Sequence, residues 1–271
     1  MRAITAGDKN KPDTNFIVFL GTGGARFVVS KQLRATGGIW FSLNHTNFIV
    51  DPGPGALVLA INSKHNLKPE TLDAILISHK HIDHSNDVNV MIEAMTCGGI
   101  KKRGVLLCPQ EVVEGEDRVV LPYLKNYLQE IVILKEGMVH QINQIEVFTP
   151  IRHKHPGEVY GFLFGFFLNE NNKIKIAYIA DTKYFDQLTT LYKADVMIFN
   201  VIKLERSDLE HLSVEDVKMI IKKAMPKLAI LTHFGMTLLK AKPHKIAESL
   251  SGELEIKVVA AYDGMKINLD I

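Results

Sequence analysis

Residues 73–88 read DAILISHKHIDHSNDV, an apolar stretch followed at once by three histidines and one aspartate within six residues. Imidazole nitrogens and carboxylate oxygens are ligands that suit zinc, manganese and iron in proteins. His79 and His81 are two residues apart, so an extended chain would direct both side chains to the same side. Asp83 and His84 come after a turn and can therefore face a second ion. The stretch predicts a catalytic metal site where a strand ends and a loop begins.

The composition is that of a globular protein. The chain has 271 residues, 46% of them hydrophobic, and a mean hydropathy of +0.06, which is enough apolar material for a sizeable core. Apolar runs such as YGFLFGFFL at residues 160–168 have about half the ~20 residues that a membrane-spanning helix needs. The first thirty residues lack the layout of a signal peptide. We therefore expect a cytoplasmic protein that does not enter a membrane.

Charge and cysteine usage exclude two further classes of protein. The net charge of +2 and the pI near 8.4 are far from the clustered basic excess of a nucleic-acid-binding domain. Cys97 and Cys108 lie in separate apolar stretches and form neither a disulfide framework nor a metal pair. We expect both to be reduced residues of the core.

Short apolar runs alternate with helical patterns along the chain, which is typical of an α/β protein. The clearest helical pattern, SVEDVKMIIKKA at residues 213–224, begins with Ser213 and Asp216 placed as an N-cap and its partner. No linker interrupts the pattern, so we predict a single domain, residues 1–271, with its sheets between helical layers. Further helices are expected after Ser85 and over residues 54–66, 109–130, 184–193 and 243–251. Eleven strands are expected, at residues 16–20, 47–51, 73–78, 104–108, 145–149, 159–168, 173–180, 194–201, 228–232, 255–261 and 265–269.

The segment HKHIDH matches the His-x-His-x-Asp-His signature of the metallo-β-lactamase-fold hydrolases. The likeness extends over residues 16–269 and implies an α/β fold, a four-layer αβ/βα sandwich in which two packed mixed sheets are flanked by helices. It also implies two divalent metal ions, with zinc as the first candidate and manganese or iron as alternatives. Gly21, Gly23 and Gly24 predict a tight turn near the site. Four further segments resemble the family in order, namely FLGTGGA (19–25), IVDPGPG (49–55), YIADT (178–182) and LTHFG (231–235).

The resemblance also implies a set of seven metal ligands. One position is open, because RHKHPGEVYGF offers both His153 and His155, which share strand parity. The spacing to the following Tyr-Gly-Phe favours His155 and leaves His153 beside the site. Asp51 is the candidate for an outer carboxylate that orients a ligand imidazole. The implied set is His79, His81 and His155 on one ion, Asp83, His84 and His233 on the other, and Asp181 bridging the two.

His211 stands just before the helix predicted at residues 213–224, where a surface histidine would be unremarkable. However, HLS followed by an amphipathic helix and LTHFG resembles the phosphodiesterase branch of the family that includes tRNase Z. In that branch this histidine acts near the scissile phosphate as a proton donor or anion contact. Only 25 residues separate His155 from Asp181, which leaves no room for the long arm with which tRNase Z grips tRNA.

These features together imply a dinuclear hydrolase that uses a metal-bridging hydroxide, with Asp83 and His211 as catalytic residues. Two divalent ions, the carboxylates of Asp83 and Asp181 and the hydroxide sum to about +1, which favours a small anionic substrate. We expect a phosphodiesterase acting on cyclic nucleotides or short phosphodiesters. The alternative is a lactone, thioester or other carboxylic ester hydrolase, and a redox or non-catalytic metal protein ranks below both. A homodimer stays open, since the sequence carries no signal for or against it.

Overall fold

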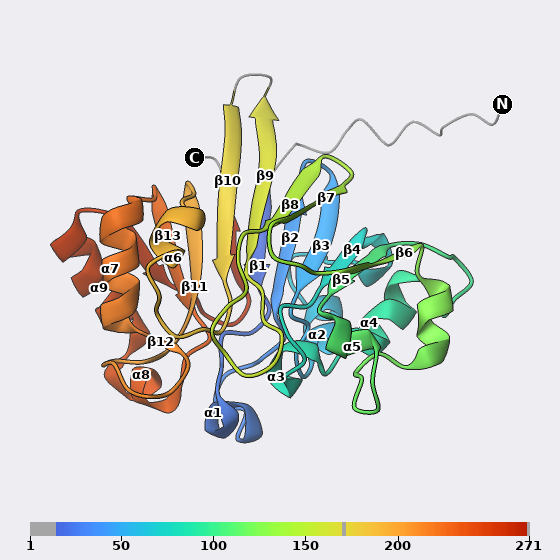
Figure 1. Cartoon of the computed structure of the whole chain (residues 1–271), viewed down its shortest axis with the longest axis horizontal. Coiled ribbons are helices and arrows are strands. Elements are labelled where there is room, and N and C mark those ends of the chain that lie inside the picture. The colour runs from blue at the N-terminus through green and yellow to red at the C-terminus, as the bar shows by residue number, and fades with distance from the viewer. Residues whose placement is uncertain (1–14, 170–171, 270–271) are drawn as a thin grey trace.

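The computed structural model describes residues 15–169 and 172–269. Two mixed β-sheets lie face to face, and helices cover the outer face of each (Figure 1). The four-layer sandwich that the sequence implies is therefore confirmed.

The first sheet joins an antiparallel half to a parallel half. The strands β15, β1, β2 and β3 are antiparallel neighbours, whereas β3, β4, β5 and β6 run parallel. The sheet has the order β15 (Met265–Asn268), β1 (Phe16–Phe19), β2 (Ile39–Leu43), β3 (Thr46–Val50), β4 (Ala74–Leu76), β5 (Val105–Cys108), β6 (Glu130–Ile133). Its outer face packs on α2 (Ala56–Ile61), α4 (Val88–Met95), α5 (Gln110–Val113) and the 3₁₀ turns η1 (Pro69–Thr71) and η2 (Pro122–Tyr127).

The second sheet repeats this division. Its strands β14, β13, β11 and β10 run parallel, and β10, β9, β8 and β7 are antiparallel neighbours. The order is β14 (Lys257–Ala260), β13 (Leu228–Thr232), β11 (Val196–Lys203), β10 (Asn172–Ile179), β9 (Phe162–Asn169), β8 (Ile145–Thr149), β7 (Met138–Ile142), and β12 (Leu212–Ser213) pairs with β11. Its outer face packs on α6 (Leu188–Leu191), α7 (Val214–Ala224), α8 (Met236–Ala241) and α9 (Pro243–Leu254).

A shared aromatic core holds the two sheets together. The rings of Phe41 and Phe48 stack at 4.8 Å between centroids in the first sheet. Phe164 of the second sheet lies 5.2 Å from Phe41 and 5.0 Å from Phe48. All three side chains are fully buried, and burying one such side chain stabilises the fold by about 1.5–3 kcal/mol. These contacts hold the two sheets face to face.

All eleven predicted strands are present, and the structure adds β2, β6, β7 and β12. The helix predicted over residues 109–130 is wrong, because only α5 and η2 form there and Glu130 already begins β6. Gly115 has a φ of 93°, outside helical geometry, and Pro122 cannot donate to a preceding helical turn. The helices predicted at residues 54–66 and 184–193 are shorter than expected, and α1 (Arg26–Ser30) and α8 were not anticipated.

The helix at residues 213–224 forms as predicted. Its capping box is complete, since the Ser213 side chain accepts from the Asp216 backbone N–H and the Asp216 carboxylate accepts from the backbone N–H of Ser213. This cap fixes where the preceding loop ends, which matters because that loop carries His211.

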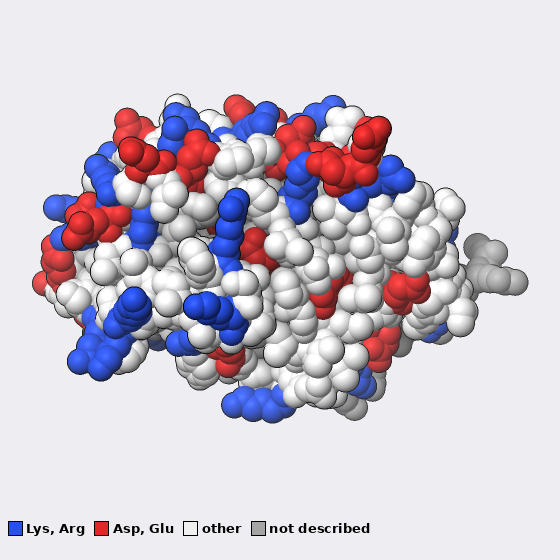
Figure 2. Space-filling view, turned by 90° about the horizontal axis from the view of Figure 1, so that it is seen from below, with Lys and Arg blue, Asp and Glu red and all other residues white. Residues whose placement is uncertain are grey.

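The polar segments gather at one edge of the sandwich. The chain leaves β4 toward α3 (Ile82–Ser85) and leaves β13 toward α8, and both helices lie at the lower edge in Figure 1. Seen from below, Lys and Arg side chains on this face are scattered among acidic and uncharged ones (Figure 2). Within the described part of the chain, no helix is long and apolar enough to cross a bilayer.

Candidate active site

The motif segment brings its polar side chains together by a single helical turn. His79 lies three residues after the end of β4, and α3 begins just after His81. The Ser85 hydroxyl donates to the carbonyls of Lys80, at 2.9 Å, and His81, at 3.0 Å, and so holds this turn. Asp83 and His84 both lie within α3. The chain therefore turns between the first pair of polar residues, His79 and His81, and this second pair.

One group of three imidazoles forms where β4 ends. The Nε2 atom of His79 lies 3.0 Å from Nδ1 of His81, and Nε2 of His155 lies 3.3 Å from the same atom. Two ligand atoms on a tetrahedral zinc, each about 2.05 Å from the ion, would be roughly 3.3 Å apart. The spacing of these three rings therefore suits three ligands of one tetrahedral ion.

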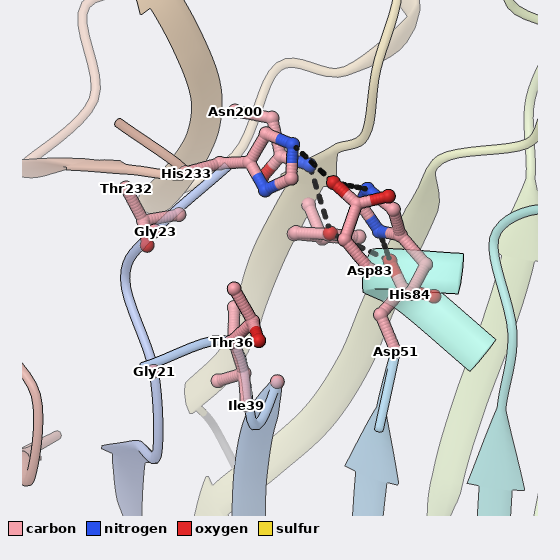
Figure 3. A pocket seen from close by; sticks show the side chains of 12 residues that line it. Gly21, Gly23, Thr36, Ile39, Asp51, Asp83, His84, Asn200, Thr232 and His233 are labelled. Atoms are coloured by element: carbon pink, nitrogen blue, oxygen red, sulfur yellow. Dashed lines mark hydrogen bonds and ion pairs between the residues drawn. The ribbon is translucent and has the colours of Figure 1, made fainter. Parts of the chain in front are cut away.

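A second group lies beside the first and is drawn in Figure 3. Asp83 Oδ2 lies 3.8 Å from Nε2 of His84 and 3.6 Å from Nε2 of His233. Asp181 faces both groups. Its carboxylate lies 3.5 Å from Nε2 of His84 and 3.3 Å from Nε2 of His233, and it can share an ion with His79 as well.

The structure separates the two candidate histidines of residues 152–162. His155 joins the first group, whereas His153 points away into the second sheet, with Nε2 3.0 Å from the Tyr192 hydroxyl. His153 is 3% exposed, and burial lowers its pKa to about 4. The placement of His155 is the one that the sequence spacing favoured.

The Asp51 carboxylate orients two of the imidazole rings, those of His84 and His79. Its carboxylate accepts hydrogen bonds from the Ser78 hydroxyl, at 2.7 Å, and from Nδ1–H of His84, at 2.9 Å. Because the single hydroxyl proton of Ser78 goes to Asp51, its oxygen must accept from Nδ1–H of His79, 2.9 Å away. Both imidazoles are thereby held with the Nε2 lone pair facing the cluster, which is the form that binds a metal.

The ring of His155 and the carboxylate of Asp181 are oriented by partners on the second sheet. Nδ1–H of His155 donates to the Glu210 carbonyl at 2.8 Å, so its Nε2 also faces the cluster. Asn200 donates to Asp181 at 2.9 Å and to the Tyr178 hydroxyl at 3.1 Å. The Tyr178 hydroxyl in turn donates to the Asp51 carboxylate at 2.7 Å, which links the supports of the two sheets.

The electrostatics of the cluster are those of a cation site. Burial raises the pKa of Asp181, but the neighbouring His233 and His84 outweigh it and hold that pKa well below its usual range. Burial lowers the pKa of His84, yet Asp83 and Asp181 reverse this and raise it well above its usual value. The pKa of His79 is lowered by burial and by the neighbouring His84. Negative charge is therefore concentrated where the imidazole nitrogens converge.

In the second group, two buried nitrogen atoms lack a hydrogen-bond partner, namely Nε2 of His84 and Nε2 of His233. Native structures rarely leave buried polar atoms unsatisfied, and a metal ion at this point would satisfy both. The donor set of imidazoles and carboxylates fits zinc, manganese or iron. The residues present therefore fit divalent metal ions.

The glycine-rich segment at residues 21–24 packs against His233. A side chain on Gly24 would overlap the His233 ring, and Gly23 pairs with Phe234 in an isolated bridge. His233 has a φ of 62° and Asp51 a φ of 51°, so both side chains project from left-handed backbone at the end of a strand. The segment expected to form a tight turn has no turn at residues 21–24, and its glycines instead allow the close approach of the His233 ring.

Three supporting residues could not be identified from the motifs alone, namely Ser78, Tyr178 and Asn200. A signal existed for Asn200, since it is the polar residue inside the apolar run VMIFNVI at residues 196–202 and is 3% exposed. Buried polar side chains in apolar strands usually have a specific partner. Ser78 and Tyr178 gave no such signal, because serine and tyrosine are common at strand ends and on half-buried strands.

Comparisons with known proteins agree with this geometry. The sequence model described as "Beta-lactamase superfamily domain" matches residues 46–234. The chain is 33% identical to MJ1374 of Methanocaldococcus jannaschii in an alignment of 260 residues that covers 93% of this chain and 94% of that protein.

Two solved structures share the fold at low sequence identity. A diphosphatase of the PhnP family is 17% identical with a TM-score of 0.68, covering 94% of this chain and 97% of that one. Human tRNase Z, short form, is 18% identical with a TM-score of 0.64, covering 94% of this chain and 100% of that one. The chain therefore belongs to the beta-lactamase superfamily and has the fold of its metal-dependent hydrolases.

Proposed function

We propose that this chain is a phosphodiesterase that cleaves small substrates, such as cyclic nucleotides or short phosphodiesters, at the cluster described above. The observation that carries the proposal is the place of His211. Its Nε2 atom lies 3.1 Å from Asp181 Oδ2, at the rim of the cluster, and its side chain is 20% exposed. It is thus an additional imidazole within reach of both the cluster and solvent.

The proposed roles follow from the geometry. The divalent ions, with zinc as the first candidate and manganese or iron as alternatives, would make water acidic and stabilise charge on the phosphoryl oxygens. Asp51 and Ser78 hold the imidazole tautomers, and His211 donates a proton to the departing oxygen. We assign His79, His81 and His155 to one ion, Asp83, His84 and His233 to the other, and Asp181 to both.

A proton donor matters most for a poor leaving group. An alkoxide departs slowly unless it is protonated, whereas a nitrophenolate is stable enough to depart as an anion. The histidine at the rim can reach the departing oxygen while the opposite side of the phosphorus faces the cluster. A carboxylic ester would make less use of this arrangement, because the first barrier there is attack on the carbonyl carbon.

Three features support small substrates. The segment between His155 and Asp181 is filled by β9 and β10 and carries no inserted arm in its described part. The net charge is only +2, and Figure 2 shows basic side chains scattered over the face of the site. The fold is shared by a protein named a diphosphatase as well as by tRNase Z. A long nucleic acid would normally need a basic surface for its phosphates.

The test compares leaving groups in the metal-reconstituted protein. His211→Ala should leave the metal content unchanged and slow hydrolysis of a cyclic nucleotide or an alkyl phosphodiester by roughly 10²–10⁴-fold. Bis(p-nitrophenyl) phosphate should be affected much less. His244→Ala, at an exposed position on α9, is the matched control and should change neither rate. Loss of metal from His211→Ala would instead make this residue a ligand, since it also lies within ligand distance of His155 and Asp181.

One observation favours the carboxylic ester alternative. Ile82, between His81 and Asp83, is 65% exposed and presents apolar surface beside the cluster. An acyl chain of a lactone or thioester could pack there. Rapid lactone or thioester turnover that His211→Ala leaves unchanged, together with absent phosphodiester turnover, would assign the protein to this class.

A further inference from the structure

The loop at residues 204–211, called here the His211 loop, touches the candidate site twice. Nε2 of His211 lies 3.1 Å from Asp181 Oδ2, and the carbonyl of Glu210 accepts from Nδ1–H of His155 at 2.8 Å. The loop contains no helix or strand, and residues 204–209 are exposed. An exposed irregular segment has much conformational freedom to lose, so specific contacts must hold it in this position.

Lys203 supplies these contacts from the end of β11. Its ammonium donates to the Ser207 carbonyl at 3.0 Å, the Ser207 hydroxyl at 3.1 Å and the Leu209 carbonyl at 2.7 Å. An ammonium has three protons, so this loop alone satisfies all of them. Lys203 is only 9% exposed, which is rare for lysine unless its charge is matched by partners.

A shared acceptor connects Lys203 directly to the proposed proton donor. The Leu209 carbonyl accepts from Lys203 Nζ and also from the backbone N–H of His211 at 2.7 Å. The far end of the loop is fixed by β12, where Leu212 and Ser213 pair with β11. The chain that bears His211 is therefore held between the lysine and the short strand.

We propose that Lys203 is a positioning residue: by holding the His211 loop it places the His211 imidazole against Asp181 and the Glu210 carbonyl against His155. The catalytic half of this inference rests on the proposed function, whereas the placement of His155 does not. Arg206 is a second anchor of the same loop, because its guanidinium lies 2.6 Å from Asp216 and ties the outer side of the loop to α7.

The first experiment needs no substrate. In the metal-loaded protein, Lys203→Met should speed amide hydrogen exchange within residues 204–211 by about tenfold or more, while exchange in β11 and β13 stays unchanged. Methionine keeps the apolar stem and removes only the donors. Lys222→Met, which removes an exposed ammonium from α7, is the matched control and should leave the loop unchanged.

A milder variant provides a second test in case Lys203→Met does not fold. Ser207→Ala removes one of the three acceptors at an exposed position and should loosen the loop less than Lys203→Met does. Unchanged exchange in the loop in both variants would overturn the proposal, whatever the enzyme's substrate.

The second experiment is a double-mutant cycle on an alkyl phosphodiester. Lys203→Met should lower kcat by about 10–100-fold, since a small misplacement of a reacting group can cost this much. In the His211→Ala background the same change should cost less than about threefold. Equal losses in both backgrounds would show that Lys203 does not act through His211. A loosened loop in a protein without any phosphodiester turnover would refute the proposed function and leave the structural role of Lys203 standing.

The placement of His155 has its own measurement. In the cobalt-substituted protein, Lys203→Met should change the visible absorption of the metal, because the His155 ring loses its fixed hydrogen-bond acceptor. An absorption spectrum identical to that of the unaltered protein would remove this half of the proposal.

Discussion

The two sheets contribute to the candidate site in different ways. The first sheet supplies His79, His81, Asp83 and His84 from one segment of six residues, placed by the single turn of α3. The second sheet supplies its ligands from loops after three different strands, and each is oriented by a partner distant in the sequence. One local segment thus carries all the ligands of the first half, although Asp51 orients two of them, whereas the ligands of the other half meet only when the whole second sheet has folded.

Asp181 is where the two halves meet, so its removal should have the largest effect. Asp181→Ala should lower the occupancy of both ions and reduce hydrolysis by on the order of 10³-fold or more. Elemental analysis of the reconstituted variant measures the first effect. Two ions per chain at full occupancy in this variant would show that the halves do not share the carboxylate.

Removing a single ligand of the second sheet should have the next largest effect. His155→Ala should lower metal content and activity together, because Nε2 of His155 faces the first group. His153→Ala is the natural comparison, since it removes the same side chain two residues away. Because His153 points toward Tyr192, its variant should keep the metal. The opposite pattern would transfer the ligand role to His153.

The residues that orient the ligands of the two halves should differ in how much they contribute to metal affinity. Asp51→Ala removes the acceptor that fixes His84 directly and His79 through Ser78, so metal affinity should fall by about 10–100-fold. Asn200→Ala removes one hydrogen bond to Asp181 and should cost only a few-fold. Metal titration with a competing chelator measures both. An equal or larger loss in Asn200→Ala would mean that the second sheet depends on its support more than the contacts indicate.

The same division explains what the sequence could predict. The motif from His79 to His84 carries its own spacing, so its ligands and its turn were recognisable before any fold was known. The Glu210 carbonyl could not be found, since any residue has a carbonyl and only the folded loop brings this one to His155. Lys203 resembled an ordinary strand-end lysine until its three acceptors were visible.

The secondary-structure errors have a similar origin. Most strands with continuous apolar runs were recognisable, but β7 reads MVHQI, has two polar residues in its middle and lies at the end of its sheet. The helix predicted over residues 109–130 failed because apolar spacing alone does not register a glycine at positive φ or a proline at the start of a 3₁₀ turn.

The left-handed backbone at Asp51 and His233 has a consequence for how such a protein tolerates change. A residue other than glycine in this conformation carries roughly 1–2 kcal/mol of unfavourable energy. In each sheet, one strand therefore ends in a strained backbone conformation that directs a side chain into the site. This strain lowers the thermal stability of the fold. Glycine at either position would relieve the backbone and abolish the side chain's role. Screens for heat resistance alone would then tend to select chains in which this site has been lost.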